Sequence, residues 1–510
     1  MADHLWDLFM RSLISTIGKE ALVLPEGSFT YGQLCQAAFS ISAQLREHSV
    51  EGPFVGLYAH RDLTTYAGML GILHAGRGYM PLHPELPQER LAAMLQGSGA
   101  QVIVTSPAHA DAAIALAARC SSRIHVIIAD ADVNGTKAVE PSTPGPYAYL
   151  LYTSGSTGVP KGVPIRQSNV LAYLSEMERI AAPTAADRFT QLFEFTFDLS
   201  VHDIFLCWAV GGTLVVPSRE QLLAPAAFVR SNAVTCWFAV PSMALLMDRM
   251  RTLKPGAMPS LRFSAFCGEP LPVDLVRKWT LAAPNSRVLN LYGPTEATIA
   301  ITAHEWQRSE ERSHLGLVPI GKPFPSARGL VLSEAGVEAE EGELWLGGPQ
   351  VAEGYWQAPE LTDQAFHMIP LQPSGRYYRT GDRVRKDEHG DLFFLSRTDQ
   401  QVKVRGHRIE LEEINHVLRE QGGAAFARTV AFPITDGIAL GLVAFVPLDI
   451  KDRSNELMNV CRTHLPEHMI PARLVFLSAL PTNANGKVDR KALLELLATE
   501  RGPGSDAATA

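Results

Sequence analysis

Several features are missing from this 510-residue chain, and each absence excludes a class of protein. No apolar run approaches the roughly 20 residues that a membrane-spanning helix needs. There is no block of Lys and Arg, and the formal net charge is −8, which argues against nonspecific binding of nucleic acid. The six cysteines contain no Cys-x-x-Cys pair, which argues against structural zinc or a disulfide framework: Cys35, Cys120, Cys207, Cys236, Cys267 and Cys461.

The N-terminal segment, Met1 to Asp7, is acidic and interrupted by charges, so it has the character of neither a signal peptide nor a membrane anchor. We therefore predict a cytoplasmic protein. With 46% hydrophobic and 19% charged residues, the composition is that of an ordinary globular protein. Because 510 residues exceed what one hydrophobic core usually supports, we expect at least two domains.

The alternation of apolar runs and helical stretches predicts an α/β fold. Short β-branched runs alternate with Ala- and Leu-rich stretches from about residue 31 to 240, which favours parallel sheet. A strand-rich region follows from about 316 to 395 and predicts a β-barrel-like subdomain. We expect a large domain over 1–398, a small mobile α+β domain over 399–500, and a disordered tail over 501–510.

The run from Leu151 to Gly162, LYTSGSTGVPKG, contains three glycines, four Ser or Thr hydroxyls and a lysine. Such a loop can bind a polyphosphate, because glycines allow close approach while hydroxyls, N–H groups and the lysine attract the anion. It is not a Walker A loop, since Pro160 precedes Lys161 and Gly162 follows it. A flexible linker is the alternative, but the apolar stretch from Ala148 to Tyr152 predicts a buried strand that fixes the loop in place.

Six further motifs follow this loop in an order that resembles the adenylate-forming enzymes, the superfamily of acyl-CoA synthetases, luciferases and amino-acid adenylation domains. The resemblance extends from about Ala21 to Leu497. It implies attack of a carboxylate on the α-phosphate of ATP, which gives an acyl-adenylate and pyrophosphate, and then transfer of the acyl group to a thiol. The motifs are NLYGPTE (290–296), GELW (342–345), YRTGD (378–382), RTD (397–399), KVRG (403–406) and NGKVDR (485–490).

The resemblance also implies which residues bind ATP and Mg2+. Glu296 would bind the Mg2+ that bridges phosphate oxygens, and Thr295 would bond the α-phosphate. Tyr292 would stack on adenine and Asn290 would contact its amino edge. The alternatives are an exposed loop carboxylate for Glu296 and a core tyrosine for Tyr292. The full predicted ATP set is Thr153, Ser154, Gly155, Ser156, Thr157, Lys161, Gly268, Glu269, Asn290, Leu291, Tyr292, Gly293, Asp382 and Arg397.

Three residues near the end of the chain acquire roles from the same resemblance. Asp382 would accept both ribose hydroxyls, with Arg397 beside it; Ser396 stands where the family usually has glycine. Lys487 would be the catalytic lysine, with Thr295 and Glu296, although a lysine is most often a solvated surface residue. Asp399 would be the hinge about which the small domain rotates between half-reactions, or else a cap or turn residue.

The choice of acid depends on Asp198, in the segment FDLSVHD (197–203). An unpaired carboxylate among apolar residues is costly, and the α-ammonium of an amino acid would offset that cost. The alternatives are an exposed loop acid or an N-cap for the helix that starts at Leu199; Asp203 is a second candidate for that cap.

The single-chain architecture is most similar to D-alanine:carrier-protein ligases, and also to other amino-acid adenylating enzymes. By the resemblance, the pocket is mostly apolar and favours a small side chain. His202 departs from the D-alanine pattern: it either contacts a polar substrate side chain or fills space. The amino acid and its stereochemistry stay open. The predicted pocket is Asp198, Leu199, His202, Phe238, Ala265, Cys267, Leu291, Ile299 and Ala300.

No phosphopantetheine attachment motif follows Lys487, and there is no condensation-type HHD motif. We therefore expect transfer of the aminoacyl group to a separate carrier protein, and a monomeric enzyme that uses ATP and Mg2+. The rival hypotheses are an acyl- or aryl-CoA synthetase and a non-catalytic nucleotide-binding homologue.

Overall fold

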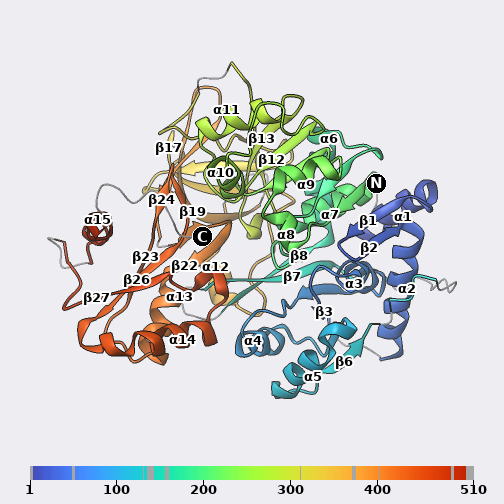
Figure 1. Ribbon diagram of the computed structural model, residues 1–510, viewed down its shortest axis with the longest axis horizontal. Helices are drawn as coiled ribbons and strands as arrows, with labels where there is room; N and C mark the ends of the chain where they lie inside the picture. Colours follow the sequence, from blue (N-terminus) through green and yellow to red (C-terminus); the bar gives the residue numbers. More distant parts are fainter. Residues whose placement is uncertain are drawn as a thin grey trace. The chain divides into compact units, whose positions relative to one another are not determined.

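The computed structural model describes residues 4–48, 52–129, 131–134, 143–155, 160–309, 312–369, 375–399, 401–483 and 488–500. Contacts divide the chain into two compact units, one of residues 1–153 with 161–399 and one of 154–160 with 400–510. Among the described helices, none is long and apolar enough to cross a membrane. The predicted α/β class is confirmed, with parallel-rich sheets and many helices in the first unit (Figure 1).

The largest sheet of the first unit has nine strands in the order β15-β14-β13-β12-β11-β9-β10-β1-β2. The six central strands from β13 to β1 are parallel, and β2, β14 and β15 join the edges in antiparallel register. The bounds are β1 (Glu20–Leu24), β2 (Gly27–Thr30), β9 (Arg188–Thr190), β10 (Thr213–Val215), β11 (Cys236–Ala239), β12 (Phe263–Phe266), β13 (Arg287–Tyr292), β14 (Thr302–Trp306) and β15 (Lys322–Pro323).

The second sheet has six strands in the order β6-β5-β3-β4-β7-β8, of which the pair β7–β8 is antiparallel and the others are parallel. The strand predicted before the glycine-rich loop is β7, and Thr153 at its end pairs with Lys161 at the start of β8. Lys161 therefore belongs to a strand and not to a helix. The bounds are β3 (Phe54–Tyr58), β4 (Gly78–Pro81), β5 (Val102–Thr105), β6 (His125–Ile128), β7 (Tyr147–Thr153) and β8 (Lys161–Arg166).

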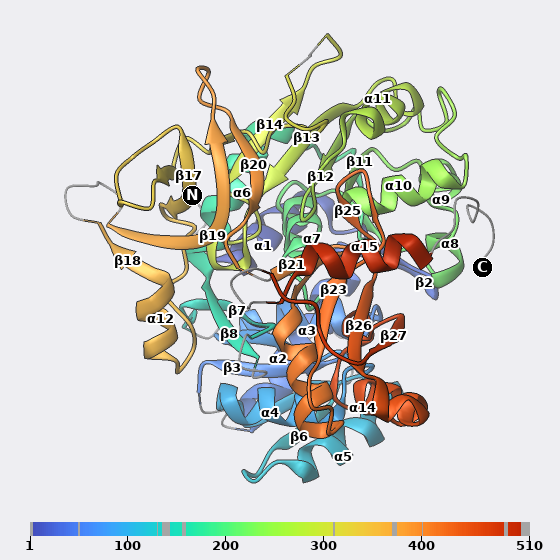
Figure 2. The ribbon, with the colours of Figure 1, turned by 90° about the vertical axis from the view of Figure 1, so that its left-hand side faces the viewer.

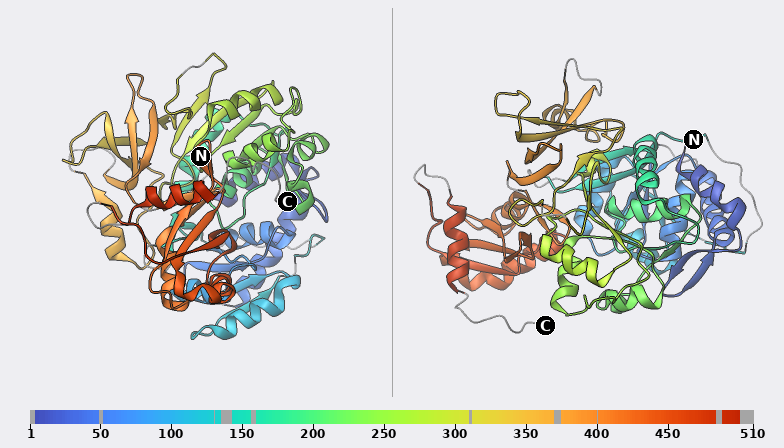
Figure 3. Two further views of the ribbon diagram at one scale, coloured as in Figure 1. Left: turned by 60° about the vertical axis from the view of Figure 1, so that its left-hand side comes forward. Right: turned by 90° about the horizontal axis from the view of Figure 1, so that it is seen from above.

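Helices surround these two sheets, as Figures 1 and 3 show in blue to green. Two of them, α3 and α7, are buried along almost their whole length. The bounds are α1 (Leu5–Thr16), α2 (Tyr31–Glu47), α3 (Leu63–His74), α4 (Gln88–Ser98), α5 (Ala110–Arg119), α6 (Gln167–Ala181), α7 (Leu199–Ala209), α8 (Arg219–Leu222), α9 (Pro225–Ser231), α10 (Pro241–Arg249) and α11 (Val273–Ala282), with short 3-10 helices at Pro107–His109 and Thr295–Ala297.

The strand-rich region predicted to be barrel-like forms a five-stranded antiparallel sheet (Figure 2). Its order is β16-β17-β19-β18, and β20 pairs with β19 beyond the short β18. Within the described residues this sheet is open, because the long β19 serves both β18 and β20 along one edge. The bounds are β16 (Arg328–Leu332), β17 (Glu341–Gly347), α12 (Pro359–Ala365), β18 (Phe366–Met368), β19 (Arg376–Lys386) and β20 (Leu392–Arg397).

The second unit has α+β character, with sheets β22-β21-β25-β24 and β23-β26-β27. The predicted basic β segment is the hairpin β21–β22, whose Arg405-Gly406 turn has φ of 50° and 82°. The bounds are β21 (Gln401–Val404), β22 (His407–Glu410), α13 (Leu411–His416), a π-helix (Val417–Gln421), β23 (Arg428–Ala431), β24 (Ile434–Thr435), β25 (Ile438–Ala439), β26 (Leu442–Pro447), 3-10 helices Leu448–Arg453 and Glu467–Met469, α14 (Ser454–His464), β27 (Arg473–Leu477) and α15 (Arg490–Glu500).

Helix α2 begins with a capping box that offers a test of local stability. Thr30 accepts a hydrogen bond from the Gln33 backbone N–H, and the Gln33 side chain accepts one from the Thr30 N–H. We expect Thr30→Ala to lower the free energy of unfolding by about 1 kcal/mol, because an orphan N–H loses its acceptor. Urea unfolding followed by fluorescence measures the change. Thr30→Ser keeps the oxygen and should retain most of the stability; equal losses in both variants would contradict the assignment.

Candidate active site

Parallel strands β11, β12 and β13 bring much of the predicted pocket to one edge of the nine-stranded sheet. Phe238 pairs with Ala265, and Ala265 pairs with Leu289. Leu291 and Cys267 come at or just after the carboxyl ends of their strands. In open α/β sheets ligands bind outside these carboxyl ends, so the register of the sheet places the residues where a ligand would bind.

Asp198 lies at the start of α7 and is only 5% exposed. It occupies the N-cap position but makes no side-chain cap bond, so the cap alternative is not realised. Its Oδ2 instead accepts a hydrogen bond of 3.0 Å from the Ile299 backbone N–H. Burial raises the pKa of Asp198 to about 6, with a further increase from the negative charge of Glu296. A carboxylate so placed gains from an incoming cation.

Asp203 is the second candidate for the helix cap, and the structure shows this prediction to be wrong. Asp203 is the fifth residue of α7 and 1% exposed, and its Oδ2 has no hydrogen-bond partner among the described residues. Burial raises the pKa of Asp203 well above its usual range, so this side chain is a neutral carboxylic acid in the core.

The loop that donates to Asp198 has an unusual backbone. Thr298 and Ile299 have φ of 56° and 70°, which β-branched residues rarely adopt. The buried Gln350 holds the loop, because its Nε2 donates to the carbonyls of Thr298 (3.2 Å) and Ala300 (2.7 Å) and its backbone carbonyl accepts from Thr298 Oγ1 at 2.6 Å. Strain of this kind persists where surrounding contacts fix it, as at binding sites. A lone glutamine gives no sequence signal, so sequence reasoning missed Gln350.

His202 is 1% exposed and packs on Phe238, with ring centroids 4.2 Å apart. It also shares a hydrogen bond of 2.6 Å with the Tyr173 hydroxyl. Of the two sequence interpretations for His202, these contacts favour filling of space. The remaining predicted pocket residues are also buried: Leu199, Ala265, Cys267, Leu291, Ile299 and Ala300.

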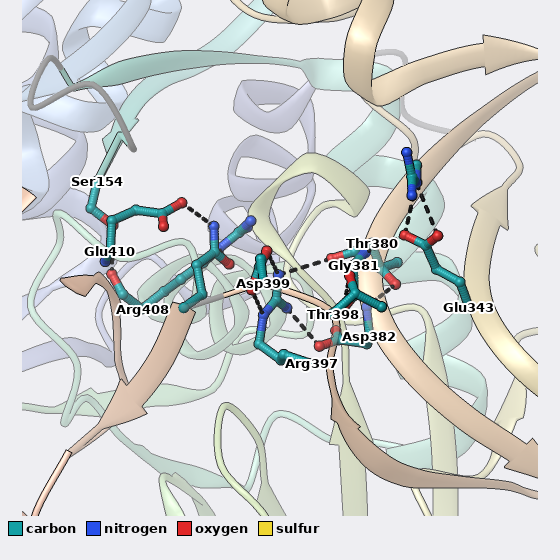
Figure 4. Close-up of polar contacts among 12 residues, drawn as sticks. Ser154, Glu343, Thr380, Gly381, Asp382, Arg397, Thr398, Asp399, Arg408 and Glu410 are labelled. Carbon is teal, nitrogen blue, oxygen red and sulfur yellow. Dashed lines mark hydrogen bonds and ion pairs between the residues drawn. The ribbon is translucent and has the colours of Figure 1, made fainter. Parts of the chain in front are cut away.

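A continuous polar network joins Tyr292 to the predicted hinge through the antiparallel pair β19–β20 (Figure 4). Tyr292 donates its hydroxyl proton to Asp382 Oδ2, and Arg397 Nη1 donates to Asp382 Oδ1 at 2.6 Å. Arg397 also donates through Nε and Nη2 to Asp399, at 2.7 and 2.6 Å. The guanidinium thus connects the predicted ribose carboxylate with the predicted hinge, which sequence spacing alone did not indicate.

Glycine is required at two positions of this network. Gly381 has φ of +72°, and a Cβ there would lie 2.9 Å from Arg397 Nη2. A Cβ at Gly293 would lie 2.6 Å from the Ala300 Cα. Both glycines let backbone approach the network without steric conflict.

Glu296 is 1% exposed and its Oε1 accepts a hydrogen bond of 2.8 Å from the Tyr355 hydroxyl. Lys161 Nζ lies 5.6 Å from the centroid of the same tyrosine ring, so Tyr355 brings together two residues 135 positions apart by numbering. The alternative of an exposed loop carboxylate is thus excluded. A carboxylate with the Thr295 hydroxyl beside it suits the oxygen preference of Mg2+, whose remaining ligands would be phosphate oxygens and water. Tyr355 was not predicted.

Two other predicted ATP residues make backbone contacts of their own. Asn290 Nδ2 donates to the Pro319 carbonyl at 2.8 Å, so a contact with adenine falls to its side-chain carbonyl oxygen. Glu269 Oε2 accepts from the Ser242 N–H at 2.8 Å, in the first turn of α10, and Gly268 before it has φ of +91°. Glu269 therefore has a structural task at a helix N-terminus.

Ser154 belongs by its contacts to the second unit, where its hydroxyl donates to the Arg408 carbonyl and accepts from the Glu410 N–H (Figure 4). Thr153 ends β7 and Gly155 follows Ser154. Several predictions fall outside the described residues, namely the sites Ser156, Thr157 and Lys487 and the tail 501–510.

A cluster of His60, His83 and Glu194 is the one group of three potential metal ligands that we find in the described part of the chain. Both imidazoles lie 3.2–3.3 Å from Glu194 Oε2, and Arg61 lies 3.3 Å from Oε1. His83 Nδ1 accepts from the Glu85 N–H, so the neutral ring carries its proton on Nε2, the atom that a metal would need. The cluster is therefore best described as an ionic network around Glu194.

The matching family model is that of the AMP-binding enzymes, over residues 11–356. This chain belongs to that family. It is an adenylate-forming enzyme, as the sequence motifs predicted. It is 30% identical to the D-alanine--D-alanyl carrier protein ligase of Bacillus licheniformis, over 95% of this chain and 99% of that protein. It is also 35% identical to a much longer protein, one of the linear gramicidin synthases of Brevibacillus parabrevis, over 95% of this chain but only 6% of that protein's length.

Among solved structures, the Vibrio cholerae adenylation domain AlmE, in complex with glycyl-adenosine-5'-phosphate, matches with a TM-score of 0.88. That match has 30% identity and covers 98% of each chain. The fold and the adenylate-forming class thus follow from independent comparisons of sequence and structure.

The pKa of Asp198 predicts a pH dependence. Protonation removes the negative charge that would attract an ammonium group, so kcat/KM for an amino acid should fall as the pH decreases through about 6. Initial rates from about pH 5 to 8 measure this limb. Asp198→Asn should have a low kcat/KM that no longer changes over this interval. A limb of equal size in the variant would show that another group titrates.

The network around Asp382 predicts a nucleotide effect. Asp382→Asn weakens the contact with Arg397 and removes one acceptor for a ribose hydroxyl. We expect KM for ATP to rise about tenfold, since hydrogen bonds to charged groups contribute roughly 1.5–3 kcal/mol. Asp363→Asn, an exposed substitution on α12, is the matched control and should leave KM for ATP unchanged. Equal KM values in the two variants would contradict a role for Asp382 at the ribose.

Proposed function

We propose that this enzyme activates a small amino acid as its aminoacyl-AMP and transfers the aminoacyl group to the phosphopantetheine thiol of a separate carrier protein. The observation that carries the proposal is Asp198, a buried carboxylate with a raised pKa that accepts a hydrogen bond from the Ile299 N–H. An α-ammonium group supplies the positive charge that this site needs. A fatty or aryl acid would leave the buried carboxylate without a counter-charge.

The relatives are consistent with a small substrate. The AlmE structure contains glycyl-adenosine-5'-phosphate, and the Bacillus licheniformis relative is a D-alanine ligase for a carrier protein. In this chain the bulky Phe238 and the His202 ring are packed together in the predicted pocket. Both observations favour an amino acid such as glycine or alanine.

In the first half-reaction, a carboxylate oxygen of the amino acid attacks the α-phosphorus of ATP, and the bond to the β-phosphate breaks to release pyrophosphate. Glu296, held by Tyr355, would bind a Mg2+ ion, which when bound neutralises charge on the phosphates. Lys161 would attract the leaving pyrophosphate, and Lys487 would contact the substrate carboxylate and the α-phosphate. Asp382 and Arg397 would hold the ribose.

In the second half-reaction, the carrier thiol attacks the aminoacyl carbonyl, and AMP leaves with the pair of electrons of the bond that breaks. Lys487 and the β21–β22 hairpin both belong to residues 400–510, so we propose that this unit rotates about Asp399 between the two steps. The ion pair of Arg397 with Asp399 would restrain that hinge.

The test is ATP–pyrophosphate exchange across the L- and D-amino acids, with fatty and aryl acids assayed in parallel. We expect exchange with small amino acids and its loss by at least about a hundredfold in Asp198→Ala, because the ammonium loses its counter-charge. Lys487→Ala gives the background rate. Exchange with fatty or aryl acids instead would establish the CoA-synthetase alternative, and nucleotide binding without any exchange would establish a non-catalytic homologue.

A further inference from the structure

We propose that Tyr173 is a positioning residue that limits the size of the substrate side chain, because it holds the imidazole of His202 across the end of the amino-acid pocket. Tyr173 lies on α6, outside the pocket predicted from the motifs. The inference rests on the proposed function, since it concerns the side-chain end of the same pocket.

The helix α7 places His202 near the substrate. His202 follows Asp198 by four residues, so the two side chains share one face of the helix, with Cβ atoms about 5–6 Å apart. An ammonium group paired with Asp198 is two bonds from its own Cβ. The first side-chain atoms of a bound amino acid therefore come within reach of the imidazole.

The imidazole is packed on its far side. Its centroid lies 4.2 Å from that of Phe238, and Phe238 in turn lies 5.1 Å from Phe193. Phe238 is fixed on β11, paired with Ala265 of β12. Burial lowers the pKa of His202 to about 3, so the ring stays neutral and fits this apolar surrounding. The aromatic contacts leave the imidazole little room to retreat.

Packing alone does not fix the rotation of an imidazole, because the torsion about its ring bond is broad. The Tyr173 hydroxyl supplies the missing constraint through the 2.6 Å hydrogen bond to Nδ1. Tyr173 is fully buried on α6, which packs against α7, so it cannot follow the histidine if that ring turns. With the ring held, a substrate side chain longer than a methyl group meets it.

The matched control is a second buried tyrosine. Tyr149 on β7 is also fully buried, but its hydroxyl has no hydrogen-bond partner in the described part of the chain. Tyr173→Phe and Tyr149→Phe each remove one buried oxygen atom, and they differ in that Tyr173→Phe also releases His202. A general effect of lost packing would be the same in both variants.

The experiment measures kcat/KM in ATP–pyrophosphate exchange for glycine, alanine, 2-aminobutyrate and valine. We expect the native enzyme to prefer glycine or alanine, and Tyr173→Phe to raise the ratio of 2-aminobutyrate to alanine about fivefold, the effect of one hydrogen bond. KM for ATP should stay unchanged. Tyr149→Phe should keep the native ratio. His202→Ala should raise the ratio at least as much, and adding Tyr173→Phe to it should change nothing further.

The outcomes separate two failures. No exchange with any amino acid in the native enzyme would overturn the proposed function. Exchange in the native enzyme with equal ratios in Tyr173→Phe and Tyr149→Phe would overturn the role of Tyr173 alone. So would a native preference for valine, or an additive effect of Tyr173→Phe in the His202→Ala background, since the tyrosine would then not act through the histidine.

Discussion

The negative charge of Asp198 is placed where water cannot reach it, and much of the surrounding structure is arranged around that fact. The carboxyl begins a buried helix, accepts a backbone N–H from a loop with left-handed φ values, and has a raised pKa. An isolated buried charge is unfavourable, so the free enzyme carries a deficit that a bound ammonium group removes. Substrate recognition and the electrostatics of the fold are then the same problem.

The loop around Ile299 shows how the fold maintains this arrangement. Two consecutive β-branched residues in left-handed conformations are unfavourable by themselves, by about 1–3 kcal/mol each. Gln350 offsets that cost through hydrogen bonds to three loop carbonyls and one from Thr298. The sheet edge, the start of α7 and this loop therefore act together, and each is held by contacts from distant parts of the first unit.

The nucleotide residues follow the same logic of shared partners. Arg397 contacts both Asp382 and Asp399, so the group that would bind ribose and the residue proposed as hinge have one guanidinium in common. Tyr355 likewise lies between Glu296 and Lys161. Residues that the motifs present as separate segments of the chain are thus linked in pairs through a third residue.

The sequence by itself determined the α/β class, the adenylate-forming family and the order of the motifs, because these depend on local periodicity and on short residue patterns. It also indicated that Asp198 carries the choice of substrate. It did not reveal Tyr173, Gln350 or Tyr355, since a lone polar residue in a helix or loop has no distinguishing pattern. It misplaced Asp203 as a possible cap, because buried acids and cap acids have the same local sequence. Only the tertiary structure decided these, because a hydrogen bond between residues 29 or 52 positions apart exists only once the chain has folded.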